Sequence, residues 1–451
     1  VSSFDPTRTL AVCGGGNNGG DGVLTALLLS RAGYSCDIYF VGDRDRTTAE
    51  TAKRISEAQE EPFITFADNP DFDEYTLIID AVFGIGLTRP VSGVAAEAIY
   101  KMNSSHIPVL AVDIPSGISA DSGRRMGAAV MADATVAIET YKRGHALSDG
   151  INSCGTVYAK EIGISTQTVS GVPMSLGKED LSLIPKRKRD ANKGTYGRVL
   201  VVGGSVGMCG AAFLSAFAAY RTGAGIVEIF TPSENRPVLQ TLLPEAVVCS
   251  YDWENPDISA LESAVARATT IVIGPGLGKS KTAEILVKKV FECANAPLIA
   301  DADALNITAE KGIPFPTEVP VIITPHPGEM SRLTGRQIRE LAADPWSVAK
   351  AYAAENEVIC VLKFARTVIS DGEKVFVNMS GGPSLAKGGS GDVLTGVIAG
   401  MLCSDLSPID AAAMGVYIHG AAGDLTAEKM GDYSPVARDV INAIPEVLKG
   451  R

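Results

Sequence analysis

The stretch TLAVCGGGNNGGDGVLTALLLSRAG (residues 9–33) decides the fold of the first part of the chain. A short apolar run is followed by a loop of glycines and asparagines, and then by a longer run with the apolar spacing of a helix. A strand that leads through glycines into a helix is the first unit of a doubly wound parallel sheet. This stretch therefore predicts an α/β fold with the glycine-rich loop at the carboxyl end of the first strand.

The same alternation of strands and helices continues along the chain and then starts again. The runs CDIYFV, TLIIDAVFG and IPVLAVDIPSG predict further strands of the first sheet, and a second, longer series begins with GRVLVVGG. A serine-, glycine- and proline-rich stretch (165–177) separates the two series. We predict two domains, residues 1–170 with a Rossmann-like doubly wound sheet and residues 171–451 with a larger α/β fold. The basic run KRKR (186–189) is expected to be a solvated joint between them.

Composition narrows the class of protein. The 451 residues are 46% hydrophobic and 20% charged, with a formal net charge of −12, which argues against a nucleic-acid partner because phosphate neutralisation needs a basic surface. No run reaches the roughly 20 apolar residues of a membrane span, and the first residues do not form a signal peptide. We therefore expect no membrane partner and a cytoplasmic location. The eight cysteines form no CxxC pair, which favours buried, reduced thiols.

Two aspartates end neighbouring strands of the first predicted sheet. Asp80 ends TLIID, and Asp113 ends VLAVD. Polar residues at the carboxyl ends of parallel strands converge on one crevice, so we expect both aspartates and the glycine-rich loop (13–22) to form one site. Read singly, each aspartate could instead cap a helix, and the loop could be a tight turn.

The stretch GGSGDVLTG (388–396) places glycines and a carboxylate directly before an apolar helix. Successive small residues let backbone N–H groups point into one concavity, and a helix N-terminus favours negative charge. Asp392 at the mouth of such an anion hole is a candidate base for a hydroxyl that attacks a phosphate. Taken alone, the stretch could equally be a glycine-rich turn capped by the aspartate.

The segments NNGGDG, DAVFGIGL and VDIPSG resemble the YjeF N-terminal family of NAD(P)H-hydrate epimerases, over roughly residues 8–165. The resemblance implies that Asp113 lies at the reacting nicotinamide ring and that a potassium ion binds Asn18, Asp80 and Ser116. It also implies a set of residues that hold the hydrated NADH or NADPH: Asn17, Asn18, Gly19, Gly20, Asp21, Gly84, Ile85, Gly86, Leu87, Thr88, Arg89 and Pro90. Members of the family usually carry a helical segment before the first strand, and this sequence begins almost on that strand, so a shorter epimerase half is expected.

Five motifs follow one another in the second half: KGTYGRVLVVGGS (193–205), GPGLG (274–278), DADALN (301–306), TPHPGEM (324–330) and GGSGDVLTG. This ordered set resembles the ADP- or ATP-dependent NAD(P)H-hydrate dehydratases, which have a ribokinase-like fold, over roughly residues 175–451. The resemblance implies phosphorylation of the C6 hydroxyl of the S hydrate, followed by loss of phosphate, with Asp392 as the base and Mg²⁺ on the nucleotide. Its implied substrate contacts are Ala211, Gly276 and His326, and its implied nucleotide contacts are Lys363, Thr367, Gly389, Ser390 and Gly391.

Some features of this half leave alternatives open. The aspartates of DADALN could order the metal or only cap the strand. The family commonly has a glycine after the lysine, whereas this sequence has the bulkier Phe364 and Arg366, so the nucleotide contacts are expected to differ there. The other three histidines, His106, His145 and His419, are expected to be ordinary satisfied side chains.

Both halves point to one damaged metabolite, so the favoured hypothesis is a bifunctional hydrate-repair enzyme that forms a homo-oligomer. A ribokinase-type small-molecule kinase would share the anion hole but would not need the first half. A third alternative is a binding module in which the first half holds nucleotides without turnover. The sequence does not decide between ADP and ATP.

Overall fold

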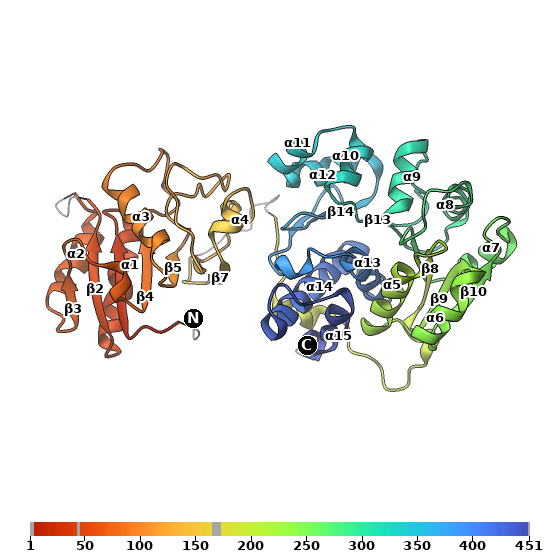
Figure 1. Cartoon of the computed structure of the whole chain (residues 1–451), viewed down its shortest axis with the longest axis horizontal. Helices are drawn as coiled ribbons and strands as arrows, with labels where there is room; N and C mark the ends of the chain where they lie inside the picture. The colour runs from red at the N-terminus through yellow and green to blue at the C-terminus, as the bar shows by residue number, and fades with distance from the viewer. Residues whose placement is uncertain (1–3, 43–45, 165–172, 450–451) are drawn as a thin grey trace. The chain divides into compact units, whose positions relative to one another are not determined.

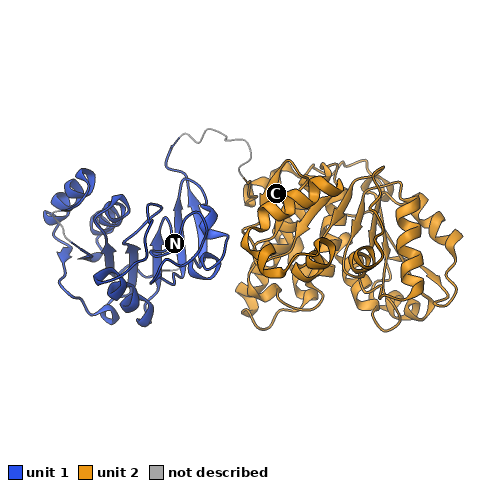
Figure 2. Cartoon of the chain, turned by 90° about the horizontal axis from the view of Figure 1, so that it is seen from above, with its two compact units in different colours: residues 1–167 blue, residues 168–451 orange. Residues whose placement is uncertain are grey.

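The chain folds into two compact units, residues 1–167 and 168–451 (Figure 2). The computed structural model describes residues 4–42, 46–164 and 173–449. The predicted boundary between residues 170 and 171 lies in the segment 165–172, outside the described residues, and stays a prediction. Each unit is built on its own sheet.

The first unit is a parallel sheet in the order β3-β2-β1-β4-β5-β6-β7 (Figure 1). Because the order reverses between β1 and β4, the loops that leave these two strands run to opposite faces and open a crevice. The strands are β1 (Arg8–Cys13), β2 (Ser35–Phe40), β3 (Ile64–Phe66), β4 (Leu77–Ala81), β5 (Val109–Val112), β6 (Ala134–Ile138) and β7 (Thr156–Lys160). The longer helices are α1 (Asn17–Arg31), α2 (Ala49–Gln59) and α3 (Val94–Ser104), with the short α4 (Gly150–Ser153).

Helices cover both faces of this sheet, as the sequence predicts. Alternate residues of β1 belong to different cores, since side chains along a strand point to opposite faces. Leu10 packs in the cluster that contains Ile99 of α3. Ala11 packs in the cluster that contains Val23 of α1 and Ile55 of α2. The doubly wound arrangement is therefore confirmed.

The second unit has a nine-stranded sheet in the order β10-β9-β8-β11-β12-β13-β14-β15-β16, parallel from β10 to β14 and antiparallel at the last two pairs. The strands are β8 (Arg198–Val202), β9 (Ile226–Pro232), β10 (Val247–Tyr251), β11 (Thr270–Ile273), β12 (Leu298–Ala300), β13 (Val321–Ile323), β14 (Ile359–Leu362), β15 (Val368–Ser370) and β16 (Val375–Val377). The helices are α5 (Cys209–Arg221), α6 (Arg236–Leu242), α7 (Ile258–Arg267), α8 (Lys281–Cys293), α9 (Asp303–Lys311), α10 (Pro327–Thr334), α11 (Ile338–Ala343), α12 (Pro345–Asn356), α13 (Ser390–Leu402), α14 (Pro408–Met430) and α15 (Ala437–Lys449).

Helix α13 lies directly on α5, and glycines permit this close approach. A Cβ on Gly396 would come within 2.1 Å of the Ser215 carbonyl oxygen, and one on Gly400 within 1.9 Å of Thr222 Oγ1. Real Cβ atoms do not approach other atoms so closely, so only glycine fits here. The contact fixes the height of α13 above the sheet and with it the position of the GGSGD segment at its start.

The structure differs from the sequence prediction in three places. The short strand β3 and the edge strand β10 were not predicted, because neither has a long apolar run. The expectation that KRKR is a joint between domains is wrong. Arg187 donates a hydrogen bond to the Gly223 carbonyl and lies 4.0 Å from the centre of the Tyr196 ring, so the run belongs to the surface of the second unit.

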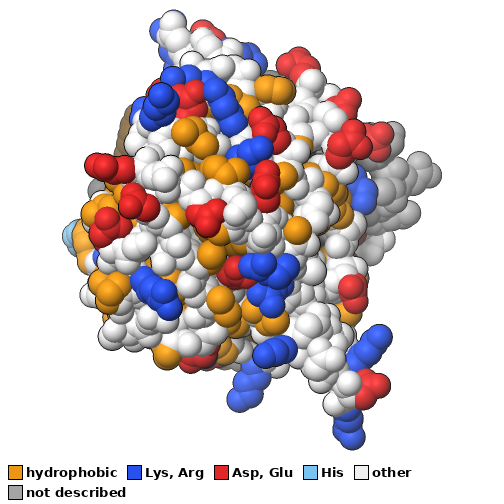
Figure 3. All heavy atoms as spheres, turned by 90° about the vertical axis from the view of Figure 1, so that its right-hand side faces the viewer, with side chains coloured by type: hydrophobic (Ala, Val, Ile, Leu, Met, Phe, Trp, Pro, Cys, Tyr) orange, Lys and Arg blue, Asp and Glu red, His pale blue; other side chains and the backbone are white. Residues whose placement is uncertain are grey.

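The cysteines and the surface fit the composition. All eight cysteines are free thiols, and four of them are buried. Over the described part of the chain, no helix is long and apolar enough to cross a membrane. The face of the second unit that carries α7 and α8 shows acidic and basic side chains intermixed (Figure 3), and Lys289 of α8 pairs with Glu262 of α7 at 3.4 Å.

We expect Gly396→Ala to lower the free energy of unfolding of the second unit by about 1–3 kcal/mol, because the new methyl group has no room against α5. Gly210→Ala is the matched control, since a Cβ on this α5 glycine meets nothing within 4 Å. Both tryptophans, Trp253 and Trp346, lie in the second unit, so tryptophan fluorescence during urea titration reports on that unit alone. Equal stability of the two variants would contradict the packing argument.

Candidate functional sites

In the first unit, α1 starts directly after the glycine-rich loop. Gly16 precedes its first residue, Asn17, and no side chain caps the helix, so the N–H groups of the first turn are available to a ligand. Gly19 is required by packing, since a Cβ there would lie 1.7 Å from the Gly14 carbonyl oxygen. The predicted contact residue Gly20 is also packed, against Thr51 of α2.

The other predicted contacts of the first unit divide into paired and exposed residues. Asp21 Oδ1 accepts a hydrogen bond from Arg54 of α2 at 2.8 Å, and its carboxylate is thus already paired. In the loop after β4, Leu87 packs against the core, whereas Ile85 is 61% exposed. The remaining exposed residues of this predicted set are Asn17, Gly86, Thr88, Arg89 and Pro90.

Asp80 and Ser116 form a buried pair at the carboxyl ends of β4 and β5. The Ser116 backbone N–H donates to Asp80 Oδ2 at 2.7 Å, and the Ser116 hydroxyl donates to Oδ1 at 2.6 Å. Burial raises the pKa of Asp80 to about 6, and the hydrogen bonds from Ser116 oppose this shift. The third predicted metal ligand, Asn18, lies beside the loop that follows β4. A Cβ on Gly84 of this loop would be 3.1 Å from Asn18 Oδ1.

Asp113 follows β5 with its backbone in the left-handed region, at φ 68°. Its Oδ1 accepts hydrogen bonds from the Ile138 N–H at 3.1 Å and from the ammonium group of Lys142. Its carbonyl oxygen lies 2.8 Å from His145 Nε2. Lys142 was not among the residues predicted from the sequence, and His145 was expected to be an ordinary side chain. Both lie in the loop that follows β6, at the same edge of the sheet as Asp113.

In the second unit, the GGSGD segment forms the uncapped start of α13. Gly389 has φ 89° and precedes Ser390, the first helical residue, so Gly391 and Asp392 fall in the first turn. The first N–H groups of a helix have no intrahelical acceptor and suit an anion. A Cβ on Gly391 would lie 3.4 Å from Lys363 Nζ, which places this ammonium group beside the segment.

A buried ion pair lies next to Asp392. Lys363 Nζ, from the end of β14, is 3.0 Å from Asp301 Oδ1, and Asp301 Oδ2 accepts a hydrogen bond from Thr395 of α13 at 2.8 Å. Burial, and then the negative charge of Asp301, raise the pKa of Asp392 to about 7, although Lys363 opposes the shift. Burial alone would lower the pKa of Lys363, but Asp301 and Glu329 together raise it. The site thus pairs a fixed cation with a carboxyl group that titrates near neutral pH.

Two of the predicted substrate contacts are brought together above β8 and β11. A Cβ on Gly276 would lie 2.9 Å from Ala211 Cβ, so the GPGLG loop and the start of α5 are in direct contact. Asp303 accepts a hydrogen bond from the Gly278 N–H at 2.8 Å. Both aspartates of DADALN thus have structural partners, Asp303 a backbone amide and Asp301 the ion pair.

His326 caps the N-terminus of α10. The ring Nδ1 of His326 accepts a hydrogen bond from the Gly328 N–H at 2.9 Å, and the backbone N–H of His326 donates to Glu329 Oε2 at 2.8 Å. Burial, with Lys363 and Arg332, lowers the pKa of His326, so the ring is neutral at pH 7. Its side chain is 51% exposed and remains accessible to a ligand.

His419, which was expected to be an ordinary satisfied side chain, lies beside Ser390 of the GGSGD segment. His419 of α14 is buried, with its Nε2 3.3 Å from Ser390 Oγ, and burial lowers its pKa to about 4. Thr367 lies just before β15, where its carbonyl oxygen accepts the Asn378 N–H at 2.9 Å. Arg366 donates to the Met379 carbonyl at 2.7 Å, so this bulkier residue is held by the segment that follows β16.

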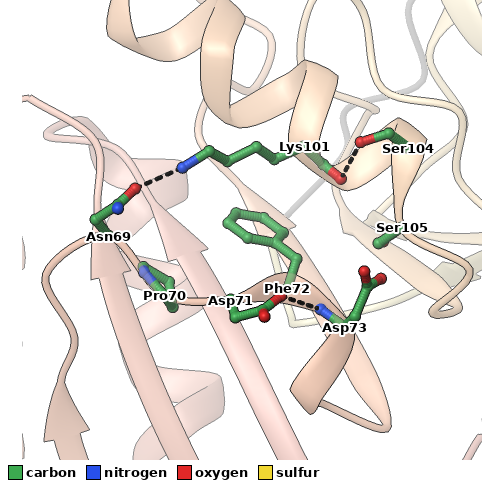
Figure 4. Close-up of a pocket in the computed structure, with 8 residues that line it drawn as sticks. All are labelled: Asn69, Pro70, Asp71, Phe72, Asp73, Lys101, Ser104 and Ser105. Atoms are coloured by element: carbon green, nitrogen blue, oxygen red, sulfur yellow. Dashed lines mark hydrogen bonds between the residues drawn. The ribbon is translucent and has the colours of Figure 1, made fainter.

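A pocket of about 320 Å³ in the first unit does not belong to the site (Figure 4). It lies between the β3–β4 connection and the end of α3, where Lys101 donates a hydrogen bond to Asn69. Because α3 ends just before β5 begins, this pocket is at the opposite edge of the sheet from Asp80 and Asp113.

The raised pKa of Asp392 makes its ionisation unfavourable for folding. Between about pH 4 and pH 7 the folded chain holds a proton that the unfolded chain releases, so the stability of the second unit falls as pH rises through this window. We expect Asp392→Asn, which cannot ionise, to be more stable than the wild type by roughly 1–3 kcal/mol at pH 8 and by much less at pH 4. Urea titrations followed by tryptophan fluorescence at both pH values measure this difference.

The control for this prediction is Asp405→Asn, because Asp405 is exposed. A surface substitution of this kind should change the free energy of unfolding by less than about 0.5 kcal/mol. A constant difference between Asp392→Asn and the wild type from pH 4 to pH 8 would show that Asp392 ionises normally in the folded chain.

Comparisons with known proteins agree with this two-unit arrangement. The model of the YjeF-related protein N-terminus matches residues 2–144, and the model of the NAD(P)H-hydrate dehydratase family matches residues 199–446. A bifunctional NAD(P)H-hydrate repair enzyme of Coxiella burnetii is 38% identical over 95% of this chain and 87% of that protein. The corresponding enzyme of Escherichia coli is 32% identical over 98% of this chain and 85% of its own.

Two solved structures resemble the second unit. The ADP/ATP-dependent NAD(P)H-hydrate dehydratase of Bacillus subtilis, co-crystallised with ATP and Mg²⁺, is 35% identical, with a TM-score of 0.56 over 62% of this chain and 98% of that chain. The ribokinase-like fold predicted for this half also agrees with a ribokinase-like superfamily protein of Enterococcus faecalis, which is 30% identical with a TM-score of 0.56 over 63% of this chain and 98% of that chain. The chain therefore belongs to the family of bifunctional NAD(P)H-hydrate repair enzymes, with an epimerase unit followed by a dehydratase unit.

Proposed function

We propose that the second unit restores the reduced nicotinamide by phosphorylating the C6 hydroxyl of the S hydrate and then eliminating phosphate. The observation that carries this proposal is Asp392, a carboxyl group with a pKa of about 7 at the uncapped start of α13, beside the Lys363–Asp301 ion pair. A general base works best when its pKa is near the working pH. A hydroxyl is a poor leaving group, whereas a phosphate ester departs readily.

Different residues of the second unit act in the phosphorylation step. Asp392 takes the proton of the C6 hydroxyl, whose oxygen attacks the terminal phosphorus of ADP or ATP as the bond to the departing nucleotide breaks. The N–H groups of Gly389 and Gly391, with Lys363, stabilise the charge on the transferred phosphoryl. Ser390, whose own N–H donates to the Lys387 carbonyl oxygen, is also placed at the nucleotide. Elimination then breaks the C6–O bond, the oxygen leaves with the electron pair as phosphate, and loss of a proton from C5 forms the double bond.

Magnesium is proposed to enter with the nucleotide. Within residues 4–42, 46–164 and 173–449, no group of three histidine, cysteine or acidic side chains could hold a metal ion by itself. Asp301 and Asp303 already bond to Lys363, Thr395 and the Gly278 amide. When bound, Mg²⁺ would neutralise the phosphate oxygens, and its ligands would come largely from the nucleotide. We place Thr367 at the nucleotide, and Ala211, Gly276 and His326 at the substrate.

We expect Asp392→Asn to lower the rate of dehydration about 10²- to 10⁴-fold, because the variant keeps the volume of the side chain and loses the base. Nucleotide affinity should change little. The assay incubates hydrated NADH epimers with ADP or ATP and follows the absorbance of the reduced nicotinamide, with Asp405→Asn as the control. Full activity of Asp392→Asn would refute the assignment, and a stable phosphate ester without reduced nucleotide would favour a small-molecule kinase.

For the first unit, we propose that Asp113 acts at the nicotinamide ring while Asn17 to Asp21 and the loop from Gly84 to Pro90 hold the hydrated nucleotide. The uncapped start of α1 and the exposed loop after β4 support this placement. Gly19 and Gly20 would contribute their backbone groups, and neither position has room for a Cβ beside Gly14 and Thr51.

We also propose a potassium ion between Asn18, Asp80 and Ser116. Asn18 Nδ2 is buried and finds no hydrogen-bond partner in the described part of the chain. Because the oxygen and nitrogen of an amide exchange places by a half-turn, Asn18 can present its oxygen at the same position. Hard oxygen ligands of this kind suit an alkali-metal ion.

We expect crystals grown with rubidium, a heavy substitute for potassium, to show an anomalous peak between Asn18, Asp80 and Ser116. The peak should be lost in Asp80→Asn, because the amide removes the negative charge that balances the ion. Crystals of the wild type grown in sodium alone are the control. A water molecule at this position in every salt would rule the ion out.

The location in the cytoplasm and the homo-oligomer remain proposals. Eight free thiols suit a reducing compartment, which supports the first. Exposed apolar residues on α3, Val94 at 55% and Tyr100 at 63%, would suit contact with a second copy.

A further inference from the structure

We propose that Lys142 is a positioning residue of the epimerase unit, which fixes the Asp113 carboxylate so that Oδ2 takes the proton of the C6 hydroxyl. This inference rests on the proposed role of Asp113. It assigns a function to a loop that neither the sequence motifs nor the proposed binding residues include.

The contacts of Lys142 are made inside the site. Its ammonium group bonds to Asp113 Oδ1 and to the Ile138 carbonyl oxygen, the latter at 2.6 Å. The side chains of Lys142 and Asp113 are only 17% and 9% exposed. An ion pair so far removed from water is held much more strongly than a surface pair. The pair therefore restricts where the carboxylate can point.

The two carboxylate oxygens of Asp113 differ in their partners. Oδ1 accepts from both the Ile138 N–H and Lys142, whereas the described residues make no hydrogen bond to Oδ2. A carboxylate with one oxygen bonded twice has its second oxygen left for a ligand. Oδ2 is therefore the atom that we assign to the substrate.

The turn that runs from Lys142 to His145 also holds the backbone of Asp113. His145 Nδ1 accepts the Lys142 N–H at 3.0 Å, so the proton of the neutral ring is on Nε2, which donates to the Asp113 carbonyl oxygen at 2.8 Å. The backbone of Asp113 is left-handed, an unfavourable conformation for a residue with a Cβ. Such a conformation persists where the surroundings determine it, and it occurs often at functional sites. The turn thus holds both the side chain and the main chain of Asp113.

Epimerisation requires that the Asp113 carboxylate is held in a fixed position. The proton of the C6 hydroxyl moves to Asp113 Oδ2, a carbonyl forms at C6, and the C6–N1 bond breaks with its electron pair going to N1. Asp113 then donates the proton to N1, and rotation about the C5–C6 bond exposes the other face of the carbonyl. Reversal of these steps closes the ring as the opposite epimer, with no oxidant or reductant consumed. A carboxylate that is free to rotate is correctly oriented toward the C6 hydroxyl for a smaller fraction of the time. Loss of the Lys142 contact should therefore lower kcat more than it raises KM.

The test is the rate at which R hydrate of NADH becomes S hydrate, measured by chromatography without ADP or ATP. We expect Lys142→Ala to lower kcat about 10²-fold with KM changed less than about threefold. Added methylammonium should restore kcat at least about tenfold in this variant, because it supplies the missing cation. Lys142→Arg should keep a larger share of kcat than Lys142→Met. The control is Lys53→Ala, which removes an exposed lysine of α2.

The outcomes separate this inference from the proposed function. A wild type that does not epimerise refutes the proposed role of the first unit, whereas an active wild type with an equally fast Lys142→Ala refutes the positioning role alone. A slow Lys142→Ala that neither methylammonium nor arginine improves also overturns it, since that pattern indicates a structural lysine. Dehydration of the S hydrate by the second unit should stay unchanged in every variant. If circular dichroism shows that Lys142→Ala unfolds, the comparison of Lys142→Met with Lys142→Arg decides.

Discussion

Both candidate sites depend on one constraint, which is that a parallel sheet delivers the carboxyl end of every strand to the same edge. In the first unit this places Asp80 and Asp113 at the same edge of the sheet as the start of α1, although more than 30 residues separate the two aspartates along the chain. In the second unit it brings Asp301 and Lys363 to the start of α13. The hydrophobic strands and the covering helices supply the stability. The chemistry is placed on the strand ends, where polar groups can meet without interrupting the core.

The structure gives its carboxylates different environments, and these decide what each can do. Asp80 is fully buried, with both oxygens bonded to Ser116, which suits a structural or ion-binding group. Asp113 has an ammonium partner on one oxygen only. Asp392 forms no ion pair with the described residues, and the nearby Lys363 is paired with Asp301, so burial dominates and the pKa of Asp392 rises to about 7. A carboxyl group with a pKa near neutral can both take and release a proton at the working pH, which suits Asp392 to a proton-transfer role.

Much of the fold and of the site could be predicted from the sequence, because apolar periodicity and glycine-rich strand ends are local signals. The start of α13 and the acids at β4 and β5 were found in this way. Lys142 could not be found by its own pattern, since a lysine in a polar loop is usually a solvated residue, and only the pairing of β5 with β6 brings it to Asp113. His419 is similar, because 29 residues separate it from Ser390. The glycines were read as ligand contacts, whereas Gly19 and Gly20 are required first by helix packing.

The two activities are expected to be chemically independent, because each unit supplies a complete set of groups. A carboxylate, a lysine and an uncapped helix start occur in the first unit as Asp113, Lys142 and α1, and in the second as Asp392, Lys363 and α13, where the lysine is paired with Asp301. The bonds that hold Asp113 are made by residues of the first unit, and the bonds that hold Asp301 and Lys363 are made by residues of the second. The benefit of joining the units is therefore a shared substrate pool. Epimerisation keeps the S hydrate supplied while dehydration consumes it, and neither step needs a residue from the other.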